Sequence, residues 1–254
     1  EPLPSNLGEL GRYVKSLRAT FGVAYDGDAD RSIFVDENGN VIWGDRSGAM
    51  LSEHVLKKHG SGRVVVGVSA SWVVEYAVKR SGGSVYWTKV GSVGITYKII
   101  ELTSKGLFAF GLEENGGFFY TPHQPVRDGA MSTALMLEAI AKTGMTIAEY
   151  NLTLPQTYTL KDKVRCPNPL KPKVMDVIVK KYSGMGYRYD TIDGIRVWLS
   201  DTEWFMIRPS GTEPVIRVFA ETLSMRKTCE IVKDVKKELH NIIEKLAKSH
   251  NFHF

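Results

Sequence analysis

The chain has 254 residues, 43% of them hydrophobic, and a formal net charge of +5. This length and composition are typical of one large or two to three small globular domains with their own cores. No apolar run approaches the roughly 18 residues of a membrane span, and the basic residues are spread along the chain instead of forming a nucleic-acid-binding patch. The first ten residues lack the features of a signal peptide, and Cys166 and Cys229 have no zinc-binding spacing. We therefore expect a cytoplasmic protein whose partners include neither membranes nor nucleic acid.

The N-terminal 40 residues combine a helix with two short strands. Ser5 is expected to cap this helix, because the apolar residues that follow it recur at helical spacing. β-branched and aromatic residues predict strands at 21–25 and 32–36. Since a domain rarely starts in this way, the chain is expected to begin in the middle of one.

Three aspartates at alternate positions lie between the two predicted strands, in the stretch DGDADR. Asp26, Asp28 and Asp30 would repel one another in a site of low dielectric constant, so a cation is expected among them. A hard divalent cation is the simplest candidate, because carboxylate oxygens are its preferred ligands. A solvated acidic turn, formed by Asx-turn chemistry around Gly27, is the alternative.

The same stretch has an EF-hand-like count of acidic residues. Counting from Asp26, position 12 is Glu37, which matches the closing glutamate of a calcium loop. Position 6, however, is Arg31 where the loop needs glycine, and both flanks read as strands instead of helices. The sequence therefore disfavours an EF-hand, although a structural metal-binding module remains an alternative function.

Strand-like and helix-like segments alternate from about residue 41 to about residue 155. This alternation predicts an α/β domain with a mainly parallel sheet. Helices are expected at 45–58, 72–80 and 96–104, and strands at 63–69, 84–90 and 106–112.

The pattern changes near residue 156, where prolines cluster and a new domain is expected to begin. Alternating polar and apolar residues predict an antiparallel sheet covered by helices, which makes residues 156–254 a smaller α+β domain. The apolar stripe of the last helix is interpreted as core and not as a partner surface. Strands are expected at 156–164, 187–189, 195–199, 204–208 and 216–220, and helices at 171–182 and 226–248.

Two more loops carry chemistry-bearing residues. GLEENGG, residues 111–117, presents Glu113 and Asn115 between glycines, and a carboxylate and an amide are suited to sugar hydroxyls. A plain hairpin turn is the alternative. RPSGTEP, residues 208–214, combines an arginine fork, two hydroxyls and a glycine that lets backbone N–H groups converge on an anion. It predicts a phosphate-binding loop, with a structural turn as the alternative.

In order, spacing and composition these three loops resemble those of the α-D-phosphohexomutases, a family that includes phosphomannomutase, phosphoglucomutase and phosphoglucosamine mutase. The resemblance implies four domains around a cleft, of which this chain would supply the end of domain 2 (1–40), domain 3 (41–155) and domain 4 (156–254). The first domain, with its catalytic serine, has no counterpart in these residues. The chain is therefore expected to be a fragment that is inactive alone, or a non-catalytic phosphosugar-binding protein.

The resemblance also implies an activity, which is the transfer of a phosphoryl group between O1 and O6 of a hexose through a phosphoserine. The expected cofactor is Mg²⁺, with a hexose 1,6-bisphosphate as activator and a hexose phosphate as substrate. Which hexose is used stays open, as does homo-oligomerisation. The implied roles are metal binding for Asp26, Asp28 and Asp30, catalysis for Arg31, sugar binding for Glu113 and Asn115, phosphate binding for Arg208, Ser210, Gly211, Thr212 and Arg217, and support for Asp45, Arg46, Arg127 and Asp128. The two supporting aspartates have a plainer alternative as helix starts.

Overall fold

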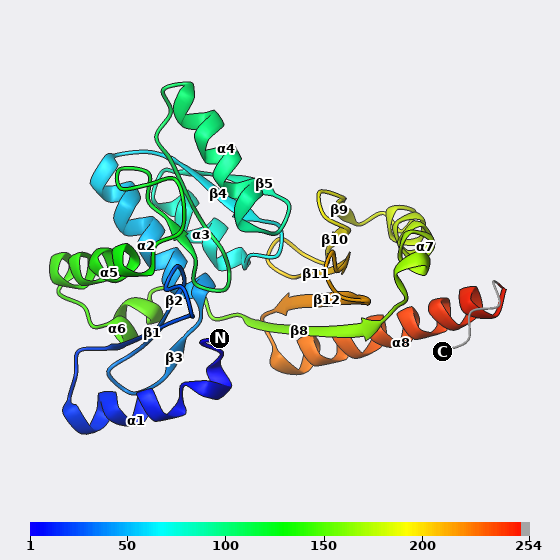
Figure 1. The fold of residues 1–254 in the computed structure, drawn as a ribbon, viewed down its shortest axis with the longest axis horizontal. Helices are drawn as coiled ribbons and strands as arrows, with labels where there is room; N and C mark the ends of the chain where they lie inside the picture. The colour runs from blue at the N-terminus through cyan, green and yellow to red at the C-terminus, as the bar shows by residue number, and fades with distance from the viewer. Residues whose placement is uncertain (250–254) are drawn as a thin grey trace. The chain divides into compact units, whose positions relative to one another are not determined.

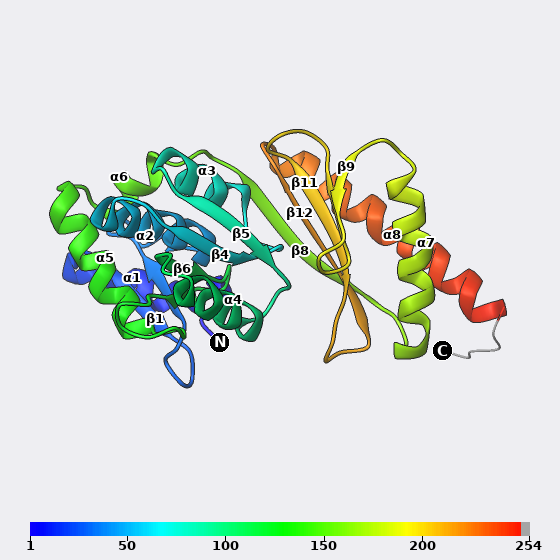
Figure 2. The same ribbon diagram turned by 90° about the horizontal axis from the view of Figure 1, so that it is seen from above.

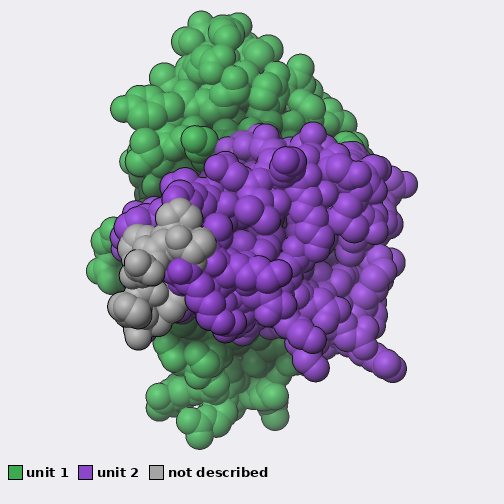
Figure 3. All heavy atoms as spheres, turned by 90° about the vertical axis from the view of Figure 1, so that its right-hand side faces the viewer, with its two compact units in different colours: residues 1–155 green, residues 156–254 purple. Residues whose placement is uncertain are grey.

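The computed structural model describes residues 1–249 and divides into two compact units, Glu1–Pro155 and Gln156–Phe254 (Figure 3). Within residues 1–249, no helix is at once long enough and apolar enough to cross a membrane.

The predicted N-terminal helix is present, but its cap is not Ser5. A 3₁₀ turn, Pro4–Asn6, contains Ser5, and the helix α1, Gly8–Leu17, begins after it. Its N-cap position is Leu7, which makes no side-chain capping bond. The fixed φ of Pro4 suits the start of a short turn, so the chain turns once before the helix begins and the capping prediction is wrong.

The strands β1 (Gly22–Tyr25), β2 (Ser32–Val35) and β3 (Val41–Ile42) form a three-stranded antiparallel sheet in the order β1-β2-β3. The aspartate loop therefore connects two strands of a hairpin, which rules out the EF-hand because its loop lies between helices. β3 pairs with β2 across the boundary expected at residue 40. Residues 1–155 group as one compact unit, and the assignment of residues 1–40 to a separate domain stays a prediction.

A second, four-stranded sheet lies in the same unit, with strand order β5-β4-β6-β7. Its strands β4 and β5 are labelled in Figure 1. β4 runs parallel to both β5 and β6, and β7 pairs with β6 in the antiparallel sense. The expected mainly parallel α/β sheet is therefore confirmed. Its elements are α2 (Gly44–His59), β4 (Arg63–Gly67), α3 (Trp72–Arg80), β5 (Ser84–Thr88), α4 (Ser92–Ser104), β6 (Ala109–Leu112) and β7 (Phe118–Phe119).

Alternate residues of the central strand β4 enter two different cores. Val64 and Val66 are fully buried in the core that α2 and α3 cover. Val65 points to the opposite face, into a smaller core with Ile95 and Ile99 of α4. The helices therefore cover both faces of the sheet, as the views of Figures 1 and 2 show, and leave the carboxyl ends of the parallel strands to the loops.

Two further helices of this unit have no predicted range, although a helix start at Asp128 is the stated alternative for the first of them. They are α5, Gly129–Thr143, and α6, Ile147–Leu152. The second has a complete capping box, in which Thr146 and Glu149 exchange side-chain and backbone hydrogen bonds, so a readable signal was present. α4 also begins earlier than the expected residue 96, at Ser92.

The second unit is a five-stranded antiparallel sheet with strand order β8-β12-β11-β10-β9. Apolar residues of one sheet face pack against α7 and α8, and the predicted stripe of the last helix lies in this core. The α+β class predicted for this part of the chain is confirmed. The elements are β8 (Tyr158–Arg165), a 3₁₀ turn (Asn168–Leu170), α7 (Lys171–Ser183), β9 (Arg188–Asp190), β10 (Ile195–Trp198), β11 (Trp204–Pro209), β12 (Val215–Thr222) and α8 (Met225–Ser249).

Candidate functional site

The aspartate loop of the β1–β2 hairpin brings its three carboxylates together. Ligand oxygens of Asp26, Asp28 and Asp30 all lie within 4.8 Å of one another. Ala29, at the tip of the loop, has a positive φ of 58°, a conformation that a residue with a side chain rarely adopts. Its carbonyl accepts a hydrogen bond from the Gly129 N–H at the start of α5, at 3.1 Å. The loop is thus held in a strained conformation by a distant helix.

Asp30 supplies an independent sign that a cation fits this loop. Its Oδ1 atom is buried and has no hydrogen-bond partner among the described residues. Burial raises the pKa of Asp30, Arg127 opposes this rise, and the charges of Asp26 and Asp28 add to it. A bound divalent cation would satisfy the free oxygen and relieve the repulsion, so the donor set fits a hard metal ion.

Arg31 lies against one of the three aspartates. Its Nε donates to Asp26 Oδ2 at 2.5 Å, its backbone N–H donates to Asp26 Oδ1 at 3.2 Å, and a third bond links Nη2 to Glu1 Oε1 at 3.2 Å. Burial raises the pKa of Asp26, but these bonds from Arg31 outweigh it and the pKa is lowered. Asp26 is therefore held ionised by a neighbour in the same loop.

The GLEENGG stretch forms the turn between β6 and β7. The Glu113 N–H donates to the Gly117 carbonyl at 2.8 Å, so the stretch is a hairpin as well as a candidate sugar loop. A Cβ on Gly117 would lie 2.5 Å from Cδ of Arg127, which explains why this position is glycine. The Ser32 N–H donates to the Gly116 carbonyl at 3.0 Å, and this bond joins the hairpin to the aspartate loop.

Arg127 links the two loops through its guanidinium. Nη1 donates to Glu113 Oε2 at 2.8 Å, and Nη2 donates to Asp30 Oδ2. Burial raises the pKa of Glu113, and Arg127 opposes this rise. One side chain thus balances charge in both the candidate metal loop and the candidate sugar loop.

Asn115 lies in a small cavity of about 40 Å³ at the carboxyl ends of the parallel strands. Its Oδ1 atom is buried without a hydrogen-bond partner in the described part of the chain. Ser69, which follows β4, and Val90, which follows β5, line the same cavity. Lys89, in the same loop as Val90, adds an exposed cation at this edge. No motif of the sequence singles out Ser69 or Lys89, although ligands of parallel α/β sheets bind at this edge and the strand pattern indicates it.

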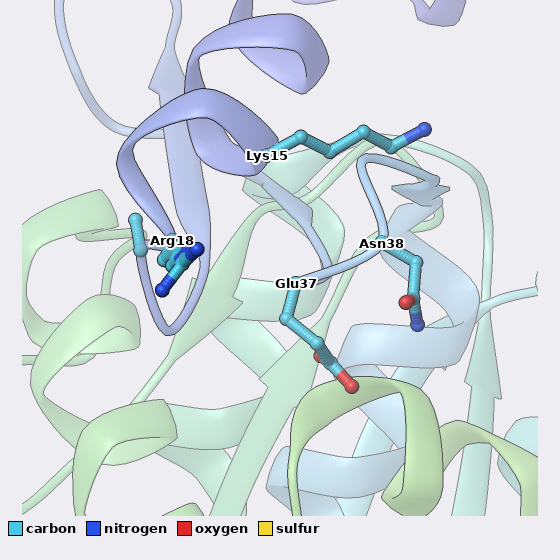
Figure 4. A pocket seen from close by; sticks show the side chains of 5 residues that line it. Lys15, Arg18, Glu37 and Asn38 are labelled. Atoms are coloured by element: carbon cyan, nitrogen blue, oxygen red, sulfur yellow. The ribbon is translucent and has the colours of Figure 1, made fainter.

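A larger cavity, of about 510 Å³, lies beside Asp30 and Arg127. Its wall is polar at these two residues and apolar along the first turns of α4, where Val93 and Tyr97 are exposed. A further hollow, of about 450 Å³, lies between the end of α1 and the β2–β3 turn (Figure 4). This hollow is bounded by Lys15, Arg18, Ala19, Glu37 and Asn38, and none of the predicted site residues lines it.

The four supporting residues divide into one that bridges the loops and three that hold the scaffold. Asp128 caps α5 by accepting from the Met131 N–H at 2.8 Å, and Asp45 accepts from the Ser71 N–H at 2.9 Å, at the start of α3. Arg46 Nη1 and Nη2 donate at 2.9 Å to the carbonyls of Pro155 and Asn151, at the end of the unit. Arg127 donates to a carboxylate of each loop, and the helix-start interpretation describes both aspartates.

In the second unit, the RPSGTEP stretch connects β11 to β12. Arg208 and Arg217 are directly opposite each other in the register of these strands, which places two like charges side by side. Arg208 Nε lies 3.0 Å from Asp193 Oδ2, and Arg217 forms an ion pair with Glu213. The Nε atoms of both arginines are buried, and neither has a hydrogen bond of good geometry in the described residues. This arrangement suits an anion.

Ser210 acts differently from the prediction within this loop. Its Oγ accepts from the backbone N–H groups of Thr212 at 3.4 Å and Glu213 at 3.1 Å, in the manner of an ST-turn. These two N–H groups therefore point at the serine and do not converge on an external anion as expected. Gly211 and Thr212 are exposed at the tip, and the Gly211 N–H has no acceptor among residues 1–249.

Comparison with known proteins places this geometry in a family. Three models of one family match the chain in order: Phosphoglucomutase/phosphomannomutase alpha/beta/alpha domain II at residues 1–39, alpha/beta/alpha domain III at 43–158, and the C-terminal domain at 163–238. The chain belongs to the α-D-phosphohexomutase family. The resemblance noted in the three loops is confirmed at this level.

Individual phosphohexomutases extend the comparison. The chain is 42% identical over 240 residues to the phosphoglucosamine/phosphogalactosamine mutase of Sulfurisphaera tokodaii, covering 93% of the chain and 52% of that protein. It is 39% identical over 233 residues to a phosphoglucomutase/phosphomannomutase of Thermococcus kodakarensis, covering 91% and 49%. A crystal structure of a family protein from Burkholderia thailandensis matches with a TM-score of 0.80 and 25% identity, covering 94% and 50%. The chain spans about half the length of the curated relatives it matches.

Proposed function

We propose that this chain is the metal-, sugar- and phosphate-binding part of a phosphohexomutase, an isomerase that moves a phosphoryl group between O1 and O6 of a hexose. The observation that carries the proposal is the bridge formed by Arg127 between Asp30 and Glu113. It ties an acidic loop suited to a divalent cation to a loop suited to sugar hydroxyls. A phosphorylated sugar is the ligand that needs both kinds of group.

Mg²⁺ is the cation that we propose for the acidic loop, held by Asp26, Asp28 and Asp30. Mg²⁺ commonly uses one or a few carboxylates together with phosphate oxygens of the substrate, and it neutralises charge on a phosphoryl group in transfer. Arg31 keeps Asp26 ionised and adds a fixed positive charge to the same loop. The orphaned Oδ1 of Asp30 supports this proposal.

Substrate binding is proposed for the other two loops. Glu113 and Asn115 would accept hydrogen bonds from ring hydroxyls, and the unpartnered Oδ1 of Asn115 supports this role. Arg208 and Arg217, with the Ser210 hydroxyl and the tip residues Gly211 and Thr212, would hold the phosphate that is not being transferred. The phosphoserine would come from a part of the protein outside these 254 residues, and a hexose 1,6-bisphosphate would prime it.

The substrate class is proposed as hexose or hexosamine phosphates. The name of one relative refers to hexosamine phosphates and that of the other to hexose phosphates. These sugars differ at C2, and we assign no residue of the three loops to C2. Turnover by the 254-residue chain with Mg²⁺, a bisphosphate activator and glucose 1-phosphate tests the expected lack of activity alone. Conversion to glucose 6-phosphate would contradict that part of the proposal.

Binding tests the rest of the proposal. We expect calorimetry on the 254-residue chain to detect Mg²⁺ and, separately, glucose 6-phosphate, with glucosamine 6-phosphate and mannose 6-phosphate as competitors and glucose as the control. No binding of any sugar phosphate would refute the proposed function. Binding of Ca²⁺ that does not depend on a sugar phosphate would favour a structural metal module.

A further inference from the structure

Lys171, the first residue of α7, is buried although it carries a charge. Only 8% of its surface is exposed. Lysine is among the residues that are almost never buried without a partner, because removing the ammonium group from water is costly. Its position therefore requires a specific set of acceptors.

Those acceptors belong to the phosphate-binding loop proposed above. Lys171 Nζ donates to the Ser210 carbonyl at 2.6 Å and to the Glu213 carbonyl at 2.5 Å. The two carbonyls lie on either side of the loop tip, so one ammonium group clamps both ends of the turn. Among residues 1–249 no carboxylate pairs with it, so its positive charge stays with the loop.

The clamp decides which way the tip of the loop faces. In a planar trans peptide the carbonyl and the following N–H point in opposite directions. Because the Ser210 carbonyl points at Lys171, the Gly211 N–H points away from it, toward the exposed side of the loop. This N–H has no acceptor in the described residues, which leaves it available to an anion.

We propose that Lys171 is a positioning residue for anion binding, which holds the Ser210–Glu213 turn with the Gly211 N–H outward and adds an uncompensated positive charge behind it. This inference rests on the proposed phosphate-binding role of the loop. Lys171 does not touch the anion itself. It acts through the two carbonyls, and nothing in the spacing of the RPSGTEP stretch indicated it, since the bonds span 39 and 42 residues.

The test compares Lys171→Met with the wild-type 254-residue chain. Methionine keeps an unbranched apolar stem but removes the ammonium group. Lys181→Met is the matched control, because Lys181 lies on the same helix and pairs with Glu238 near the surface. We expect the dissociation constant for inorganic phosphate, measured by calorimetry at low ionic strength, to rise about tenfold in Lys171→Met and to stay unchanged in the control.

Amide hydrogen exchange supplies a readout of the clamp itself. Exchange at Thr212 and Glu213, whose N–H groups donate to Ser210 Oγ, should accelerate in Lys171→Met and not in Lys181→Met. Lys171→Arg, which keeps a donor and the charge, should recover part of the phosphate affinity. Wild-type phosphate affinity in Lys171→Met, or unchanged exchange at the loop, would overturn the proposal. If the wild type binds no phosphate, the proposed function of the loop fails, whereas the exchange comparison still decides whether Lys171 clamps it.

A measurement on the wild type covers the case in which Lys171→Met does not fold. The protons of the Lys171 ammonium group are expected to exchange slowly with solvent, because the group is buried and bonded to two carbonyls. The ¹⁵N resonance of this group should therefore be observable. It should shift when phosphate is titrated, since the anion binds on the other side of the same peptide. Ammonium protons of Lys171 that exchange as fast as those of Lys181 would contradict the inference. A Lys171 resonance that does not respond to phosphate would contradict it as well.

Discussion

The two units each gather like charges, but they balance them in different ways. In the first unit three aspartates converge, and the balancing Arg127 reaches Asp30 from 97 residues away in sequence. In the second unit Arg208 and Arg217 lie opposite each other on adjacent strands, and Glu213 pairs with Arg217 from four residues away. The first site thus depends on a partner that is distant in sequence. The second combines a local partner within one hairpin with Asp193 and Lys171, which reach the loop from outside that hairpin. Each site keeps buried polar atoms that make no hydrogen bond among the described residues, which suits a bound ion of opposite charge.

The largest expected effect comes from removing the long-range partner in the first unit. Arg127→Met leaves Asp30 and Glu113 without their shared cation, so we expect the free energy of unfolding to fall by about 2–4 kcal/mol. Mg²⁺ should stabilise this variant more than the wild type, because it replaces part of the lost positive charge. Urea unfolding with and without Mg²⁺ measures both effects.

Arg226→Met is the control for that comparison. Arg226 has a side chain that is 88% exposed and pairs with Glu230 on the same helix, so its loss should leave the free energy of unfolding nearly unchanged. If Arg127→Met is as stable as this control, the bridge does not organise the first site.

Asp28→Asn probes the acidic loop without disturbing its scaffold. Asp28 is the exposed member of the three aspartates, so its charge serves the cation more than the fold. We expect Mg²⁺ affinity to fall about tenfold or more with the melting temperature unchanged. Calorimetric titration of Mg²⁺ checks this, with Asp201→Asn, a change at another exposed aspartate, as the control. Equal Mg²⁺ affinity in the two variants would remove Asp28 from the metal site.

Arg208→Ala is the corresponding change in the second unit. Loss of the guanidinium fork should weaken phosphate binding by about tenfold. The affinity of the wild type should also fall as ionic strength rises, because the contact is electrostatic. Phosphate titration followed by chemical shifts at 210–212 tests this. Shifts of wild-type size in Arg208→Ala would reduce the loop to a structural turn.

The smallest effect is expected from removing the local partner in the second unit. Glu213→Gln keeps the backbone groups of the turn but takes a carboxylate away from Arg217 and Lys163. Because both ion pairs are partly exposed, we expect phosphate to bind only about two- to threefold more tightly. Weaker binding, measured by the same titration, would show that Glu213 supports the anion site instead of competing with it.

The sequence predicted the loops better than it predicted the contacts between them. The three motifs and the two fold classes could be read because hydrophobic period, glycine and charge spacing are local properties. The role of Ser210 as an acceptor for loop N–H groups was missed, although ST-turn chemistry is local too. α6 was also missed, even though the capping box at Thr146 was legible, and α5 was anticipated only through the alternative of a helix start at Asp128.

What the sequence by itself determined is the chemistry available: three carboxylates in one turn, a carboxylate and an amide in a second, and an arginine and hydroxyls in a third. What only the tertiary structure decided is which distant side chain completes each loop. Arg127 reaches Asp30 and Glu113, Lys171 reaches the carbonyls of the phosphate loop, and Arg46 is directed to α6. These partners are chosen by the packing of helices against the two sheets, because a buried charge must find an acceptor wherever the fold carries it.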